Sequence, residues 1–339
     1  MKHIIYFVLF FFSAQVHGQQ LSTIHVILQN ADKLNIEKRR FFNQPDYEKT
    51  GTPSNSQLAF QLNRGYNLPN FANFKAQKID EKNYIISIRS DQPEMIYLNY
   101  QPVYVEPGDN ATVTYSVILK TFDQLIDTVI AEGSKKGNYE FAKYITKAST
   151  KIKFPDITAN QYKDKVALFY HDLKDYYHTL NAVYDHDPRF KTCSKELIDY
   201  LKRRNLEAFF FSLIFSEKKL KAESNMPGVK LLGDSLEKDF RKAQFKASDT
   251  LLNFTMENLF KKYFERTVTD KFGNLAHEDN YRAFYDYVKN FENKFVREYF
   301  LMLLIANYAD KVKKYNPELI TNIKNEIANV QILNALRKK

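Results

Sequence analysis

The chain has 339 residues, of which 44% are hydrophobic and 15% aromatic, so its composition excludes a disordered protein and its length allows two domains with separate cores. The formal net charge is +10, but acidic residues are interspersed among the basic clusters, which argues against the one-sided basic face of a nucleic-acid-binding protein. The single cysteine excludes both an internal disulfide and the Cys-x-x-Cys motif of thiol redox enzymes.

The first 18 residues have the pattern of a secretory signal peptide. Lys2 gives a basic start, residues 4–12 form an apolar run too short to span a bilayer, and Val16-His17-Gly18 fits cleavage before Gln19. No later run is long and apolar enough to span a membrane; the longest, residues 299–306, is expected to lie in a buried helix. The sequence therefore predicts a periplasmic or secreted protein with no transmembrane span after signal cleavage.

Residues 19–133 carry short runs of β-branched and alternating residues, which are typical of strands. Turn-forming residues separate these runs, so the spacing predicts an amino-terminal antiparallel β-sandwich domain. Residues 125–131 could form a last strand or a first helix, and Gly133 and Gly137, which follow, favour the strand. The other predicted strands are residues 23–28, 84–88, 95–100, 103–105 and 111–118.

Pro107-Gly108-Asp109 predicts a tight turn between two of these strands. Proline fixes one φ angle, glycine accepts a positive φ, and aspartate bonds nearby backbone groups. We therefore expect a hairpin that pairs residues 103–105 with 111–116. In that hairpin Gly108 has a φ that opposes a side chain, and Asp109 bonds the backbone just beyond it.

Residues 134–339 indicate an α-helical domain, because apolar residues recur at steps of three and four. Asn138 is the expected N-cap of the first helix. The acidic residues within the basic clusters are interpreted as part of solvated helix surfaces; they are Glu196, Asp199, Glu207, Glu217 and Glu223. Further helices are predicted over residues 160–186, 194–222, 235–246, 250–265, 276–290, 292–313 and 317–336.

The densest group of metal-ligating residue types lies in the predicted helix 160–186. His171, Asp175 and His178 are spaced one turn apart, and imidazole with carboxylate suits zinc, so these three side chains could bind a divalent metal from one helix face. The opposing interpretation is a solvent-facing row of polar residues, because the apolar stripe of the helix faces elsewhere. The His-Glu-x-x-His motif of zinc proteases is absent.

Other candidate residues favour structural roles. Cys193 is expected to be partly buried near a helix start, with a reactive thiol as the minority interpretation. No nucleophile elbow, glycine-rich phosphate loop or EF-hand loop occurs, so no catalytic residue and no cofactor is predicted. A group of tyrosines could line a binding cleft, but their spacing favours the core for most of them: Tyr66, Tyr97, Tyr100, Tyr104, Tyr176, Tyr177, Tyr281, Tyr285 and Tyr287.

Four short segments resemble one protein family. Residues 78–89 are similar to the turn and strand, and residues 103–114 to the strand, Pro-Gly-Asp and strand, of the amino-terminal sandwich domain of envelope TlpA-like thiol–disulfide oxidoreductases. Residues 132–141 resemble the step into the helical region of that family, and residues 295–308 resemble one of its later helices. The resemblance implies a sandwich followed by helices, and it brings no catalytic residue with it.

The thioredoxin domain of that family, with its Trp-Cys-x-x-Cys motif, has no counterpart in a sequence with one cysteine and no tryptophan. The chain would then be either a shortened relative that keeps the non-catalytic part or the product of a gene that has lost its tail. We expect a non-enzymatic binding or interaction protein whose partner is an envelope protein or a small ligand, and not a nucleic acid. The alternative is an enzyme or metal-binding protein that uses His171, Asp175 and His178.

Overall fold

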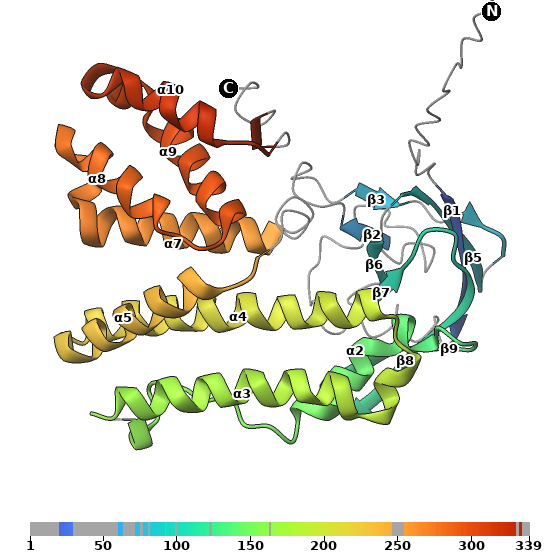
Figure 1. Ribbon diagram of the computed structural model, residues 1–339. Coiled ribbons are helices and arrows are strands. Elements are labelled where there is room, and N and C mark those ends of the chain that lie inside the picture. Colours follow the sequence, from blue (N-terminus) through green and yellow to red (C-terminus); the bar gives the residue numbers. More distant parts are fainter. Residues whose placement is uncertain are drawn as a thin grey trace, which may run out of the picture. The chain divides into compact units, whose positions relative to one another are not determined.

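The computed structural model of the protein describes residues 20–29, 60–63, 72–74, 77–80, 82–91, 93–98, 101–121, 124–162, 164–245, 254–329 and 332–333 (Figure 1). The predicted signal peptide lies outside these residues. The chain divides into two compact units, and the division falls between Glu140 and Phe141, inside helix α2 (Lys136–Ser149). The first unit contains the described strands, apart from Ala72, and the second contains the remaining helices, which confirms the predicted α+β class.

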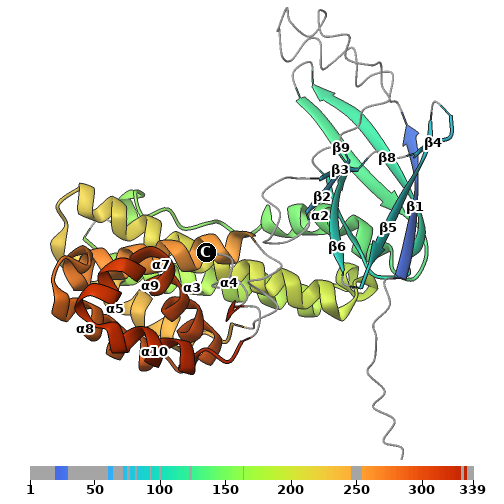
Figure 2. The same cartoon turned by 90° about the horizontal axis from the view of Figure 1, so that it is seen from above.

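The larger sheet has five strands, with β1 in the centre (Figure 2). Its order is β4 (Gln77–Lys78), β5 (Asn83–Ser90), β1 (Gln20–Gln29), β8 (Asn110–Thr121) and β9 (Gln124–Ala131). The prediction that 125–131 form a strand is confirmed by β9. The prediction of antiparallel pairing is wrong for β1 and β8, which run parallel with Thr23 opposite Asn110. Parallel neighbours need a long connection, and no local turn signal reports such a pairing.

The second sheet has the order β3 (Ala72–Phe74), β2 (Phe60–Asn63), β6 (Glu94–Leu98) and β7 (Gln101–Val105). Because β7 belongs to this sheet and β8 to the larger one, the predicted hairpin is wrong. The turn at Pro107 carries the chain from one sheet to the other instead of folding it back on itself. Gly108 has the expected positive φ of 81°.

The first unit has one apolar core. Alternate residues of β1, namely Ile24, Val26 and Leu28, are buried on the same face of the sheet, as the period of two in a strand requires. Buried residues of the second sheet, such as Ile96 and Val103, belong to the same hydrophobic cluster. Strands of both sheets therefore contribute to a shared core.

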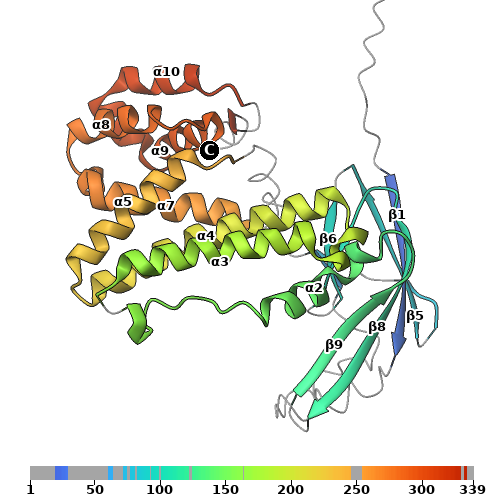
Figure 3. The same cartoon turned by 60° about the horizontal axis from the view of Figure 1, so that its bottom comes forward.

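The helices follow the predicted order, and α3 and α4 lie side by side as long helices (Figure 3). The predicted helix 160–186 is interrupted at Asp164, whose φ is 61°. Asn138 lies inside α2 and is fully buried, so the prediction that it is the N-cap is wrong. The other helices described are α3 (Val166–His186), α4 (Lys195–Ala222), α5 (Met226–Lys242), α7 (Phe254–Phe272), α8 (Glu278–Lys289), α9 (Lys294–Tyr315) and α10 (Pro317–Glu326).

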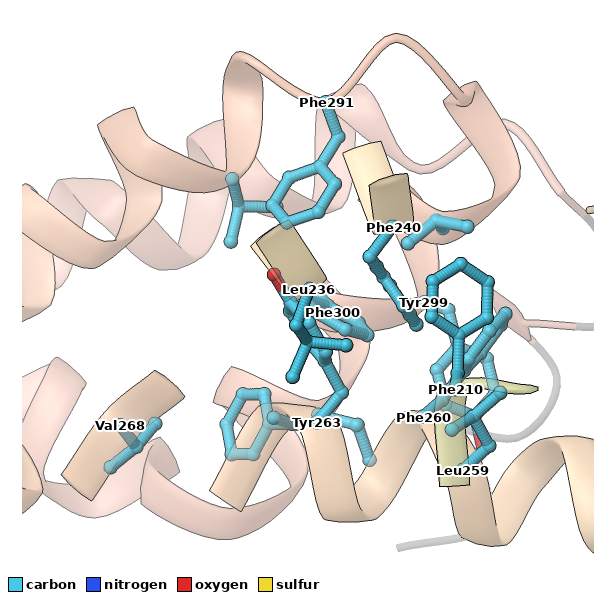
Figure 4. Packing of buried hydrophobic residues seen from close by; sticks show 14 of the residues in the cluster. Phe210, Leu236, Phe240, Leu259, Phe260, Tyr263, Val268, Phe291, Tyr299 and Phe300 are labelled. Carbon is cyan, nitrogen blue, oxygen red and sulfur yellow. The ribbon is translucent and has the colours of Figure 1, made fainter. Parts of the chain in front are cut away.

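Aromatic side chains fill the core of the helical unit (Figure 4). Phe240 of α5 is fully buried and stacks on Tyr263 of α7 with ring centroids 3.8 Å apart. It also contacts Phe260 and Phe300, so rings from α5, α7 and α9 meet at one place. The apolar run 299–306 lies in α9, and residues 299–304 are buried, as expected. None of the described helices combines the length and the apolar sequence that a membrane crossing requires.

Candidate functional site

The predicted metal residues lie on the exposed side of α3. His171 is 71% exposed, and its Nδ1 is 3.2 Å from Oδ2 of Asp175, one turn along the helix. His178 is also exposed, so these side chains face solvent while the apolar stripe of α3 faces the core. Among the described residues, no three histidine, cysteine or acidic side chains are arranged to hold a metal ion. The structure therefore brings His171 and Asp175 together, and no third ligand from the described residues joins them.

Cys193 lies between a short 3-10 helix, η3 (Pro188–Thr192), and α4, whose N-cap is Ser194. Its thiol is partly buried, as the sequence predicts, and burial raises its pKa to about 12. A thiol with this pKa carries almost no thiolate at neutral pH, and the thiolate is the reactive form. The geometry thus favours the structural interpretation of Cys193 over the reactive one.

Asp109 organises a polar network at the turn between the two sheets. Its carboxylate, only 5% exposed, accepts hydrogen bonds from Lys135 Nζ at 2.8 Å, from Tyr139 Oη at 3.1 Å and from the backbone N–H of Glu106 at 2.9 Å. The bond to Glu106 runs back along the chain, so the prediction that Asp109 bonds the backbone beyond it is wrong. Ser22 Oγ accepts from the Gly108 N–H and donates to the Glu106 carbonyl. These contacts fasten the turn to β1 and to the start of α2.

A second polar network lies inside the helical unit. Arg266 of α7 is 10% exposed and binds Glu217 of α4, which is 5% exposed, through both Nε and Nη2. Burial alone lowers the pKa of an arginine, but the hydrogen bond and charge of Glu217 outweigh it and raise the pKa of Arg266. The interpretation of Glu207 and Glu217 as surface acids is wrong, because both are buried. Each is compensated by an arginine, as a buried carboxylate requires.

Arg241 of α5 belongs to another ion pair of the helical unit and binds Glu237, with Nη2 2.7 Å from Oε1. Lys271 of α7 binds the same Glu237. The Arg241 guanidinium carbon lies 4.7 Å from the ring centroid of Tyr287 on α8, and the Arg266 guanidinium carbon lies 5.9 Å from that of Tyr263. Two guanidinium groups thus lie against two phenol rings, an arrangement favoured by cation–π attraction.

These four side chains, Arg241, Tyr263, Arg266 and Tyr287, are called the Arg–Tyr cluster below. Within the described part of the chain, Arg241 Nε, Arg266 Nη1 and both tyrosine hydroxyls are buried without a hydrogen-bond partner. Burial first, and then the neighbouring Tyr287 hydroxyl, raise the pKa of Tyr263 well above its usual range. The two hydroxyls are therefore close enough to interact with each other. Buried polar atoms are normally satisfied, so this group of atoms calls for an explanation.

Sequence reasoning missed most of this cluster. Tyr287 was among the tyrosines that could line a cleft, whereas its neighbours Tyr281 and Tyr285 are buried core residues, as the spacing favours. The sequence signal that could have found these residues is a charged residue at a position where the helical spacing predicts a buried apolar one. Arg266 follows the buried Tyr263 by three positions, and Glu217 follows the buried Leu213 by four.

Comparisons of the chain and its structure with protein-family models, curated proteins and solved structures found no match. Its function must therefore be inferred from its own residues.

Proposed function

We propose that the protein is a periplasmic or secreted binding protein that has no catalytic role of its own and binds a small polar ligand at the Arg–Tyr cluster. The observation that carries this proposal is the group of four buried polar atoms on α5, α7 and α8 for which the described residues supply no hydrogen-bond partner. An incoming ligand with complementary polar atoms would remove the free-energy cost of leaving them unpaired, which is about 1–3 kcal/mol for each buried group. The location is supported by the signal-peptide pattern of residues 1–18.

We further propose a relation to the accessory region of envelope TlpA-like proteins, in which the two sheets pack face to face as a sandwich. The order of sheets followed by helices supports this relation. The shared hydrophobic cluster, which contains Val26 of one sheet and Leu98 of the other, supports the face-to-face packing. The high pKa of the Cys193 thiol supports a role other than thiol exchange.

Ligand binding can be tested by thermal unfolding of the purified full chain with four probes: inorganic phosphate, acetate, glucose and choline. We expect at least one probe to raise the melting temperature in a saturable manner, because a ligand that binds only the folded state stabilises it. Tyr263→Phe should weaken this effect. Tyr281→Phe is the matched control, since Tyr281 is equally buried but already donates to the Leu275 carbonyl at 2.8 Å. If no probe acts, or if both variants respond as the wild type does, the cluster is not a binding site.

A metal-binding role for His171, Asp175 and His178 is the second candidate. The short contact between His171 and Asp175 favours it. Metal analysis of protein prepared without a histidine tag tests it directly. Stoichiometric zinc in the wild type that is lost in His171→Ala would support this role. Protein that contains no zinc after incubation with zinc and gel filtration would rule this role out.

A further inference from the structure

We infer that the Arg–Tyr cluster selects a small oxyanion, a carboxylate or a phosphate group, as its ligand. This inference rests on the proposed binding function and adds the chemical class of the ligand. It follows from the charge of the surrounding side chains, from the donor character of the unpaired polar atoms and from the geometry of the guanidinium groups.

The charges around the cluster do not balance. Arg266 and Lys221 are matched by Glu217 and Asp270, with Lys221 Nζ 2.7 Å from Asp270 Oδ2. On the other side, Arg241 and Lys271 share one carboxylate, that of Glu237, among the described residues.

Within the described part of the chain, one positive charge of this group is therefore left without a matching carboxylate. Since Arg241 is partly buried beside Tyr287, a negative ligand would be attracted more strongly there than at a solvated surface.

The unpaired atoms are mainly donors. Arg241 Nε and Arg266 Nη1 carry N–H groups that can donate but cannot accept, and arginine does not lose its proton in proteins. Burial raises the pKa of Tyr263, so its hydroxyl stays protonated and can donate as well. A ligand that satisfies these groups must offer several acceptor atoms, which carboxylate and phosphate oxygens do. A cation would instead add an unpaired charge.

The Glu217 carboxylate does not satisfy these unpaired donors. Glu217 is occupied by Nε and Nη2 of Arg266, which leaves the third nitrogen of that guanidinium free to bind something else. Arg266 is thus held in place by one carboxylate and presents a fixed N–H group. Planar guanidinium groups bind carboxylate and phosphate oxygens with directional, charge-assisted hydrogen bonds, which are stronger than neutral ones.

A bridging water is the alternative occupant, because water can both donate and accept and would satisfy the same atoms. It differs from an oxyanion in charge, so it predicts no dependence of stability on a particular anion. Measuring the stability of the protein in sulfate, phosphate or acetate at constant ionic strength, with chloride as the reference, distinguishes the two occupants. Phosphate against acetate also identifies which oxyanion is preferred.

The experiment measures the dissociation constant of inorganic phosphate and of acetate by isothermal titration calorimetry with the full chain. Wild type and Tyr281→Phe should bind at least one of them equally well. Tyr263→Phe and Tyr287→Phe should each raise the dissociation constant about tenfold, since each removes one hydrogen bond to a charged ligand. Each variant removes one buried hydroxyl and keeps the packed ring, so it should fold about as stably as the wild type.

Three outcomes would overturn the inference. Binding of phosphate that is equal in wild type and Tyr263→Phe places the anion elsewhere on the protein. In the second outcome, glucose or choline binds, Tyr263→Phe weakens that binding, and phosphate, sulfate and acetate do not bind. This result would support the proposed binding function but contradict an oxyanion as the ligand. Absence of binding by every probe removes the binding function itself, and the inference with it.

Discussion

Gly233 on α5 lies so close to Arg266 on α7 that a Cβ atom at position 233 would stand 2.9 Å from Nη2 of Arg266. The same Cβ would be 2.9 Å from Oε1 of Glu217. Both atoms belong to the buried ion pair, so neither can move aside without weakening it. The absence of a side chain at Gly233 is therefore what allows α5 to pass over this pair.

Gly233→Ala should destabilise the protein by about 1–3 kcal/mol, although glycine to alanine normally stabilises a helix. The cost arises because the added methyl group separates the Glu217 and Arg266 side chains. Urea unfolding followed by circular dichroism measures it. Ser235→Ala, two residues along α5, is the matched control and should be neutral or slightly stabilising. A Gly233→Ala protein as stable as wild type would mean that the ion pair adjusts freely.

Gly108→Val should also destabilise, by about 1–3 kcal/mol, because a β-branched residue opposes the φ of 81°. Its Cβ would in addition lie 2.5 Å from Oε1 of Gln20, but that atom ends a flexible side chain and can move. Gly133→Val, with a φ of 97° and no atom of the described residues within 4 Å of the added Cβ, isolates the backbone contribution. Thermal unfolding of both variants should give similar losses. A much larger loss for Gly108→Val would assign the cost to the Gln20 contact.

Cys193 should react slowly with a thiol reagent in the folded protein and quickly after unfolding. Burial raises the pKa of its thiol to about 12, so the thiolate fraction at pH 8 is very small. Labelling with 5,5′-dithiobis(2-nitrobenzoic acid) in buffer and in guanidinium chloride compares the two states. Cys193→Ser gives the background. A native labelling rate equal to the unfolded rate would show an accessible, reactive thiol.

Asp187 should titrate at about pH 2. The side-chain hydrogen bond from Arg189, followed by the Arg189 backbone N–H, lowers its pKa from 3.8 to about 2. Because the folded pKa lies below the unfolded one, this carboxylate stabilises the fold above pH 3.8, and the contribution is lost as the pH falls towards 2. Carboxyl carbon chemical shifts follow the titration. Arg189→Gln should move the midpoint towards 3.8, and an unmoved midpoint would contradict the assigned cause.

Strand and helix positions could be predicted from the sequence because they depend on local periodicity. The alternation in β1 and the three- and four-residue steps in α4 each reflect one buried face, which is visible in a single segment. Pairing could not be predicted in the same way. Pro107-Gly108-Asp109 indicates that the chain turns, but β8 finds its partner β1 far back in the sequence and β7 pairs with β6.

The candidate site was hidden from the sequence for a related reason. Arg241, Tyr263 and Tyr287 lie on three different helices, and no motif spacing connects them. Whether a charged side chain is solvated or buried depends on which helix packs against it. Glu217 is an example. The two lysines that follow it in the sequence indicate an exposed position, whereas the structure places its side chain against Arg266.

The central position of β1 makes the larger sheet depend on non-local strand pairing. Thr23 pairs with Ser87 on one side and with Asn110 on the other, so both pairings close long stretches of chain. Such non-local contacts cost loop entropy before they yield stability, which makes pairing of this kind slow. Without β1, the described pieces that remain in this sheet, β4 with β5 and β8 with β9, share no neighbouring strand. The first described strand of the chain therefore joins the two halves of the larger sheet. A truncation that removes residues 20–29 would leave two separate hairpins of the described strands.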